Sequence, residues 1–248
     1  FVPSAFSQKK IPKQKKVIIN SIEEKREKLI EISDNIWEAA ELSLREFKSS
    51  KYLSDYAEEN GFTVKKGVAG IPTAFTATYG SGRPIIGIMG EFDANAGISQ
   101  KKQPTKEPLI KGAAGHGCGH NLFGTASLAA AIAIKEQIES GEISGTVIFY
   151  GTPAEETIFA KVWMVREGLF DKLDLCMDWH PGSEIAAATQ SSKALVDFRL
   201  KFFGNAAHAS GDPWNGNSAV DALELYTTGL NYYREHIKPT ARIHYDCL

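Results

Sequence analysis

Residues 122–150, LFGTASLAAAIAIKEQIESGEISGTVIFY, contain an Ala-rich apolar run, a glycine-containing turn and a short segment rich in β-branched and aromatic residues. The apolar run predicts a helix over about 122–140, and the last five residues predict a buried strand. The alternation continues with a predicted helix at 158–167 and a predicted strand at 173–178. Strands that alternate with helices favour an α/β fold, here with a central mixed, largely parallel sheet flanked by helices.

The sequence on either side of this region extends the prediction. Upstream, apolar spacing predicts two helices and three strands, at 21–40, 46–59, 62–66, 73–79 and 85–89. A loop at 91–119 follows, and loops of this length are often functional. After about Ser192 the pattern changes: an alternating segment predicts a strand at 194–203 with one wet face, and a helix is predicted at 219–236. We therefore expect a second domain to begin near residue 192.

The composition is typical of a soluble globular protein. The 248 residues carry 28 basic and 30 acidic side chains, for a formal net charge of −2. This near balance argues against a nucleic-acid partner, which usually requires a basic excess. The longest nearly apolar stretch, Ala126–Ile134, is too short to span a bilayer. Three cysteines do not make a disulfide framework, so the question is whether one of them has a chemical role.

The first twenty residues are expected to form a flexible segment. Residues 8–19 contain five lysines, which favour a solvated arm over a membrane or nucleic-acid role. Ala5 and Ser7 occupy the small-residue positions that precede a signal-peptide cleavage site. A signal-peptide remnant would imply a periplasmic or secreted protein, whereas a disordered lead-in would leave a cytoplasmic one. Both interpretations stay open.

The segment GHGCGHN at 115–121 places imidazole and thiol groups at every second position, with glycines between them. These groups suit zinc and similar borderline metals, and the glycines let the backbone bend so that the ligands converge. The following helix is expected to favour a thiolate at Cys118 through its positive N-terminal end. A glycine-rich loop with incidental histidines is the alternative. Because the sequence contains no CxxC pair, a structural zinc finger is not expected.

Three further candidate clusters follow predicted strands, where sites gather in α/β sheets. They are GEFDA at 90–94, GTPAEE at 151–156 and DWHP at 178–181. Glu155 and Glu156 cannot point the same way on an extended backbone, so one can bind a metal while the other faces substrate. Asp93 is expected to touch a metal or to orient a ligand, and His180 is a candidate ligand. Taken singly, the pair Glu155 and Glu156 also fits the start of a helix, Asp93 fits a turn, and His180 fits an ordinary packed histidine.

Two other features bear on the chemistry. GNAAHAS at 204–210 sets His208 among small residues, where it could approach a substrate closely or be an ordinary loop residue. The dinucleotide, P-loop and nucleophile-elbow fingerprints are absent from the sequence. A thiol enzyme with Cys118 as nucleophile is a separate hypothesis, because His116 and His120 are its neighbours in sequence.

Five segments of the chain resemble, in the same order, the motifs of the co-catalytic aminoacylase/carboxypeptidase metallopeptidases. They are GEFDA, GHGCGHN, GTPAEE, the His of DWHP, and GNAAHAS. The Cys-Gly-His form is similar to that of the amidohydrolase branch. GEFDA followed by GISQ, together with GHGCGHNLFG, most closely resembles the aminobenzoyl-glutamate utilisation protein B group. The resemblance covers nearly the whole chain from about Ser21.

The resemblance implies a residue-by-residue assignment of the site. Four residues match metal ligands: Cys118, His120, Glu156 and His180. Glu155 matches the general base, and His208 matches an oxyanion-stabilising residue of a lid domain. Asp93 matches an acidic position near the metals, and Asn217 matches a position that helps to hold the substrate.

The resemblance also implies the organisation and activity of the protein. Residues 21–191 would be the N-terminal part of a metal-dependent catalytic domain, and residues 192–248 a partial α+β lid and dimerisation domain. Two divalent ions per site, Zn or Mn, would support hydrolysis of the amide bond of N-acyl or N-aroyl amino acids or small dipeptides, in a homodimer. Because members of this family are nearly twice as long, the chain is expected to be an N-terminal fragment whose second metal site is incomplete. A catalytically incomplete metal-binding or dimerising fragment is therefore the alternative function.

Overall fold

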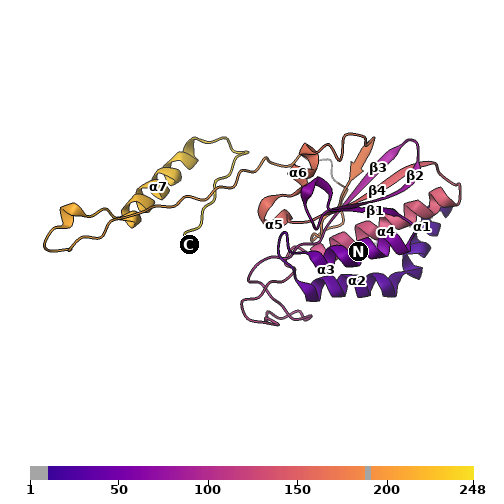
Figure 1. Cartoon of the computed structure of the whole chain (residues 1–248), viewed down its shortest axis with the longest axis horizontal. Coiled ribbons are helices and arrows are strands. Elements are labelled where there is room, and N and C mark those ends of the chain that lie inside the picture. The colour runs from indigo at the N-terminus through magenta and orange to yellow at the C-terminus, as the bar shows by residue number, and fades with distance from the viewer. Residues whose placement is uncertain (1–10, 188–190) are drawn as a thin grey trace, which may run out of the picture. The chain divides into compact units, whose positions relative to one another are not determined.

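The computed structural model describes residues 11–187 and 191–248, and it divides into two compact units with a boundary between Glu184 and Ile185. The first unit contains a five-stranded sheet with helices on both faces, and the second contains one long helix, α7 (Figure 1). The cleavage-site positions Ala5 and Ser7 lie outside the described residues. No helix in the described ranges is both long and apolar enough to cross a membrane.

Three helices precede the first strand and pack beside the long central helix of the first unit. They are α1 (Lys13–Glu24), α2 (Arg26–Ala39) and α3 (Phe47–Glu59), and the central helix is α4 (His120–Glu139). Much of the lysine run predicted as a flexible arm is therefore helical. The end of α1 is joined to α4 by a 2.6 Å ion pair between Lys25 and Glu136.

The sheet is mixed and has the strand order β1-β2-β4-β3-β5. Its strands are β1 (Thr63–Lys66), β2 (Phe75–Ser81), β3 (Ile85–Glu91), β4 (Gly145–Thr152) and β5 (Leu175–Met177). β3 runs parallel to both β4 and β5, whereas β2 is antiparallel to both β1 and β4. The predicted α/β class and the mixed sheet are confirmed, and the parallel strands form the part of the sheet that leads to the candidate site.

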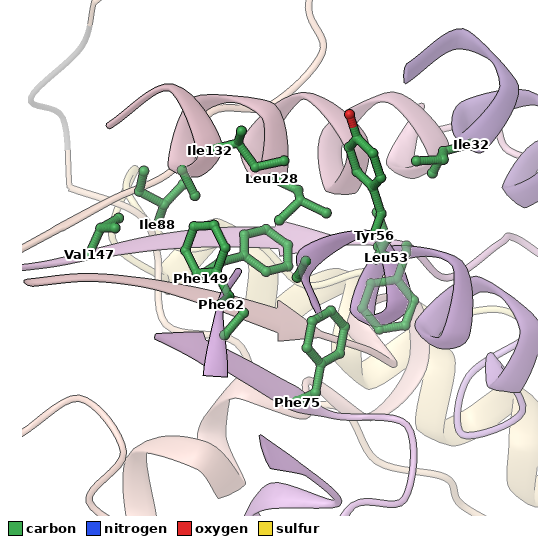
Figure 2. Packing of buried hydrophobic residues seen from close by; sticks show 14 of the residues in the cluster. Ile32, Leu53, Tyr56, Phe62, Phe75, Ile88, Leu128, Ile132, Val147 and Phe149 are labelled. Atoms are coloured by element: carbon green, nitrogen blue, oxygen red, sulfur yellow. The ribbon is translucent and has the colours of Figure 1, made fainter. Parts of the chain in front are cut away.

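The main core lies between the sheet and α2, α3 and α4. Figure 2 shows Leu128 and Ile132 of α4 facing the strands, where the ring of Phe149 lies against them. The rings of Phe75 and Phe149 are 5.6 Å apart and tilted, an arrangement that aromatic pairs favour. Residues at i and i+4 share a helix face, and Leu128 and Ile132 of the Ala-rich helix are accordingly both buried in this core. This packing fixes α4 relative to β3 and β4.

A second core lies on the opposite face of the sheet, under two short helices, α5 (Glu155–Ile158) and α6 (Lys161–Arg166). The sequence predicts one continuous helix at 158–167, but Phe159 takes up a left-handed backbone (φ 54°) and ends α5. The break lets Met164 of α6 pack into this core while α5 stays at the carboxyl end of β4.

In the second unit, α7 (Ala219–Tyr233) agrees with the predicted helix and continues into a short 3₁₀ turn at Arg234–His236. Ser218 caps α7 by accepting a hydrogen bond from the Asp221 amide. The predicted strand at 194–203 is not a strand here, although its alternation of apolar and polar residues is clear. A strand needs a hydrogen-bonding neighbour, and no strand pairing includes this segment among the described residues.

Candidate metal centre

The candidate site lies where the parallel strands end. Glu91 is the last residue of β3, Glu155 follows β4, and His180 follows β5. His120 is the first residue of α4, which crosses the end of β3. Carboxyl ends of parallel strands meet at one edge of a sheet, so residues far apart in sequence are brought to one place.

Close packing between glycines allows α4 to approach the sheet. A Cβ at Gly124 of α4 would come within 2.7 Å of the Glu91 carbonyl oxygen, and one at Gly90 would lie 3.0 Å from the Gly124 Cα. A Cβ at Gly119 would lie 2.9 Å from Cγ of Pro181. These three glycines therefore set the distance from His120 to β3 and to the His180 segment.

His120 is the centre of the cluster and is completely buried. Its Nδ1–H donates to Asp93, with Oδ1 at 3.0 Å and the main-chain oxygen at 3.1 Å. This bond fixes the tautomer, so Nε2 faces the acidic side chains opposite. The Glu91 carboxylate lies 2.9 Å from Nε2, and the Glu156 carboxylate lies 3.8 Å from it.

Two sets of potential ligand atoms surround His120. One set consists of Cys118, His120 and His180, and the other of Glu91, His120 and Glu155; within each set the ligand atoms lie within 4.8 Å of one another. The carboxylate of Glu156, the fourth predicted ligand, lies 3.8 Å from Nε2 of His120, the residue that the two sets share. The structure therefore brings all four predicted ligands and the predicted base into one cluster.

The donor atoms fit a cation. Three buried atoms in the cluster lack a hydrogen-bond partner in suitable geometry: Glu91 Oε2, His120 Nε2 and Glu156 Oε1. These atoms face one another, because Nε2 lies 2.9 Å from the Glu91 carboxylate and 3.8 Å from that of Glu156. His180 is exposed, and its Nδ1–H lies 2.9 Å from the Pro181 carbonyl oxygen, which leaves Nε2 available. Imidazole, thiol and carboxylate groups are all donors that bind divalent metal ions in proteins.

The acidic surroundings determine the charge of His120 when no metal is bound. Burial opposes the imidazolium, but the carboxylates of Asp93 and Glu91 outweigh it and raise the pKa of His120 to about 10. A divalent cation can replace that proton, because a metal-ligating imidazole is neutral and binding releases protons. The same carboxylates that hold the proton would then attract the metal.

Cys118 differs from the sequence-based expectation. Partial burial, together with Glu156, raises the pKa of the thiol to about 11, although the α4 N-terminus was expected to favour a thiolate. Burial and the neighbouring carboxylates of Glu156 and Glu155 all disfavour the thiolate. A thiol with such a pKa is a poor nucleophile at neutral pH, which weighs against the thiol-enzyme hypothesis. Metal coordination, in contrast, would deprotonate it.

Asp93 and Glu91 have different roles in the cluster. Asp93 orients its neighbours: Oδ1 accepts from His120, and Oδ2 accepts from the Glu156 amide at 2.9 Å. Glu91 was not singled out by sequence reasoning, although it lies in the GEFDA segment two residues before Asp93. It forms an ion pair with Lys161 of α6. Its place as the last residue of β3, beside the metal-type cluster, was the signal that could have identified it.

The remaining predicted residues, His208 and Asn217, belong to the second unit. His208 Nδ1 accepts from the amides of Ser210 and Gly211, at 3.2 and 2.9 Å, so its ring is held within its own loop. Asn217 pairs with Asn205 through backbone hydrogen bonds of 3.0 and 2.9 Å. These contacts give both residues a local structural role, and their functional roles stay predictions.

Known proteins with similar sequences are hydrolases of amide and peptide bonds. The chain is 45% identical over 231 residues to one of the subunits of the p-aminobenzoyl-glutamate hydrolase of Escherichia coli, a match that covers 92% of this chain and 48% of that protein. It is 32% identical to the Xaa-Arg dipeptidase of Mus musculus, over 98% of this chain and 55% of that one. The chain thus spans about half the length of the curated relatives it matches.

The fold is also shared with solved structures. A Bacillus subtilis protein described as a dinuclear metal-binding peptidase from the M20 family matches with a TM-score of 0.52 and 23% identity, over 60% of this chain and 41% of that one. No family profile matches the chain. Because the chain is 45% identical to the Escherichia coli protein across most of its own length and shares the fold, it belongs to the amidohydrolase family that includes the p-aminobenzoyl-glutamate hydrolase of Escherichia coli.

Proposed function

We propose that the protein from which this chain comes is a metal-dependent amidohydrolase. Its substrates would be N-acyl or N-aroyl amino acids of the aminobenzoyl-glutamate kind, or small dipeptides, with a free carboxylate. The observation that carries the proposal is the convergence of Cys118, His120 and His180 with the acidic side chains at the carboxyl ends of β3 and β4. The similar sequences, an aminobenzoyl-glutamate hydrolase and a dipeptidase, support the substrate class.

Two divalent ions, zinc or manganese, would supply Lewis-acid activation of a water molecule and of the amide carbonyl when bound. Cys118, His120, Glu156 and His180 would hold them, and Asp93 would keep the His120 ring and the Glu156 backbone in place. The description of the Bacillus subtilis neighbour as dinuclear supports the number of ions. The thiol favours zinc, and the carboxylates are compatible with manganese.

Glu155 is the proposed general base. Burial and then the negative charge of Glu91 raise the pKa of its carboxyl, which moves it towards the neutral range where a base is most effective. The proton taken by Glu155 from water would pass to the leaving amine. Lys161 moderates this shift, since its ammonium lowers the pKa of Glu155. The α5 backbone, short and fixed at both ends by left-handed residues, holds the carboxylate at the site.

The second unit is proposed to begin a lid and dimerisation domain over 192–248. In it His208 would stabilise the oxyanion during catalysis, and Asn217 would contact the substrate. Loss of one oxyanion donor typically costs about 100- to 1000-fold in rate. A homodimer formed through this domain is part of the same proposal.

Elemental analysis of the purified chain tests the metal centre. The chain should hold near-stoichiometric zinc or manganese after reconstitution, and the Cys118→Ala/Glu156→Ala double variant should lose it. Cys176→Ala/Glu142→Ala is a matched control, because both residues are exposed and lie outside the cluster. Loss of metal in both double variants, or in neither, would contradict the assigned ligands.

Activity is tested separately, with the protein extended to the length of its relatives. Release of p-aminobenzoate from p-aminobenzoyl-glutamate, or of amino acid from other N-acyl substrates, should require the added metal. Metal binding without turnover of any of these substrates would favour the alternative of a metal-binding protein that lacks catalysis.

A further inference from the structure

Glu46 is a completely buried carboxylate that the proposed chemistry does not use. It immediately precedes α3, where an acidic residue would usually cap the helix. Its side chain makes no such cap. Glu41 takes that role and accepts hydrogen bonds from the amides of Lys48 and Ser49, at 3.1 and 2.8 Å. The Glu46 carboxylate is therefore free to point into the protein.

Both oxygens of Glu46 have specific partners. Oε1 accepts from the Ala154 amide at 2.9 Å, across 108 residues of sequence, and Oε2 accepts from the Thr73 hydroxyl at 3.0 Å. No ion pair in the described part of the chain includes Glu46. Burial of an unpaired carboxylate is costly, so the bonds to these two partners must have a structural or functional benefit.

Ala154 is the residue on which the carboxylate acts. It is completely buried and has a left-handed backbone, with φ 58° and ψ 36°, which is unfavourable for a residue with a Cβ. Glu155 and Glu156 come directly after it. The Ala154 amide donates the hydrogen bond to Glu46, so the buried carboxylate contacts the backbone at the disfavoured conformation that precedes both glutamates.

Two buried acidic side chains thus bind alternate backbone amides in the segment 154–156. Glu46 binds the amide of Ala154, and Asp93 binds the amide of Glu156 at 2.9 Å. Asp93 also orients His120, whereas Glu46 forms no hydrogen bond with the cluster side chains. We propose that Glu46 is a positioning residue that fixes the direction of Glu155 and Glu156 through the Ala154 amide. The expected effect of Glu46 on metal binding rests on the proposed function, whereas the hydrogen bonds of Glu46 do not depend on it.

Substitution of Glu46 tests this role. Glu46→Leu removes the acceptor, and we expect zinc or manganese affinity of the chain to fall about 10- to 100-fold, as for other residues that support metal ligands. Glu46→Gln keeps one acceptor for the Ala154 amide, so we expect its loss of affinity to be smaller than that of Glu46→Leu. Thr73→Val is the matched control, since it removes the other bond of the same carboxylate and should leave affinity unchanged.

A second readout does not require metal. Amide hydrogen exchange of the peptide that covers 152–157 should accelerate in Glu46→Leu and not in Thr73→Val. If the original chain binds no metal, the proposed function fails, and the exchange data alone decide the role of Glu46. If Glu46→Leu does not fold, Glu46→Asp replaces it, because the shorter side chain withdraws the acceptor from Ala154. Unchanged exchange and unchanged metal affinity in the folded variant would overturn the proposal.

Discussion

Asp93 lies directly behind His120: its Oδ1 is 3.0 Å from His120 Nδ1, and both side chains are almost completely shielded from solvent. A carboxylate in this position fixes the tautomer of the imidazole and increases its basicity as a ligand. The same side chain binds the Glu156 amide through Oδ2. One aspartate therefore aligns two proposed ligands that come from different elements.

Asp93→Asn should weaken metal binding without loss of the fold. The amide is a poorer acceptor for His120 and can present a donor to the Glu156 amide, so the two proposed ligands lose their alignment. We expect metal affinity to fall about 10- to 100-fold, measured by calorimetric titration with zinc or manganese. Asp55→Asn is the control, because it removes only exposed pairs with Lys51 and Lys66. An equal effect of both substitutions would argue against a specific role for Asp93.

Glu155→Gln should separate metal binding from turnover. The amide cannot accept the proton of water, so kcat of the extended protein should fall by at least about 100-fold. Because Glu156, and not Glu155, is a proposed ligand, the metal content should stay unchanged. Turnover on p-aminobenzoyl-glutamate and elemental analysis of the same sample check the two statements. Full activity in this variant would remove Glu155 from its assigned role.

Glu46 should make stability depend on pH. Burial raises its pKa to about 7 from an ordinary value of 4.5, and the negative charge of Asp93 adds to the shift. The folded state therefore binds the proton more tightly than the unfolded state does. The free energy of unfolding should decrease as pH rises from about 4.5 to about 7, by up to roughly 3 kcal/mol, and level off above that.

Glu46→Gln removes this titration and supplies the comparison. The difference in unfolding free energy between the two proteins should change across the same pH range, measured by urea denaturation of metal-free samples. A constant difference from about pH 4.5 to about pH 7 would mean that Glu46 does not titrate in this window.

Gly124→Ala should disturb the site through packing. The added Cβ would lie 2.7 Å from the Glu91 carbonyl oxygen, an atom of the backbone that cannot easily move. We expect a loss of about 1–3 kcal/mol in unfolding free energy, and weaker metal binding because α4 carries His120. Gly229→Ala in α7 is the control: its Cβ meets nothing within 4 Å, so the change should be neutral or stabilising by up to about 1 kcal/mol. Equal destabilisation by both would refute the packing explanation.

The sequence alone was sufficient for the elements with strong periodicity and for the types of site residue. The apolar pattern of 122–140 and the β-branched run at 146–150 predict α4 and β4, because helix and strand periods are local properties of the chain. The chemistry of GHGCGHN and GTPAEE is likewise local, since the side chains themselves are the metal-type donors. Motif order was enough to indicate the family, which the similarity to known hydrolases confirms.

Tertiary structure decided which of those residues act together. The role of Asp93 as a support for His120, the presence of Glu91 in the cluster, and the contact from Glu46 to Ala154 join residues 27 to 108 positions apart. The raised pKa of Cys118 depends on its burial and on the carboxylates of Glu156 and Glu155, which belong to another element. The segment 194–203 has the alternation of a strand and yet is not one, because a strand requires hydrogen-bond partners that its own sequence cannot provide.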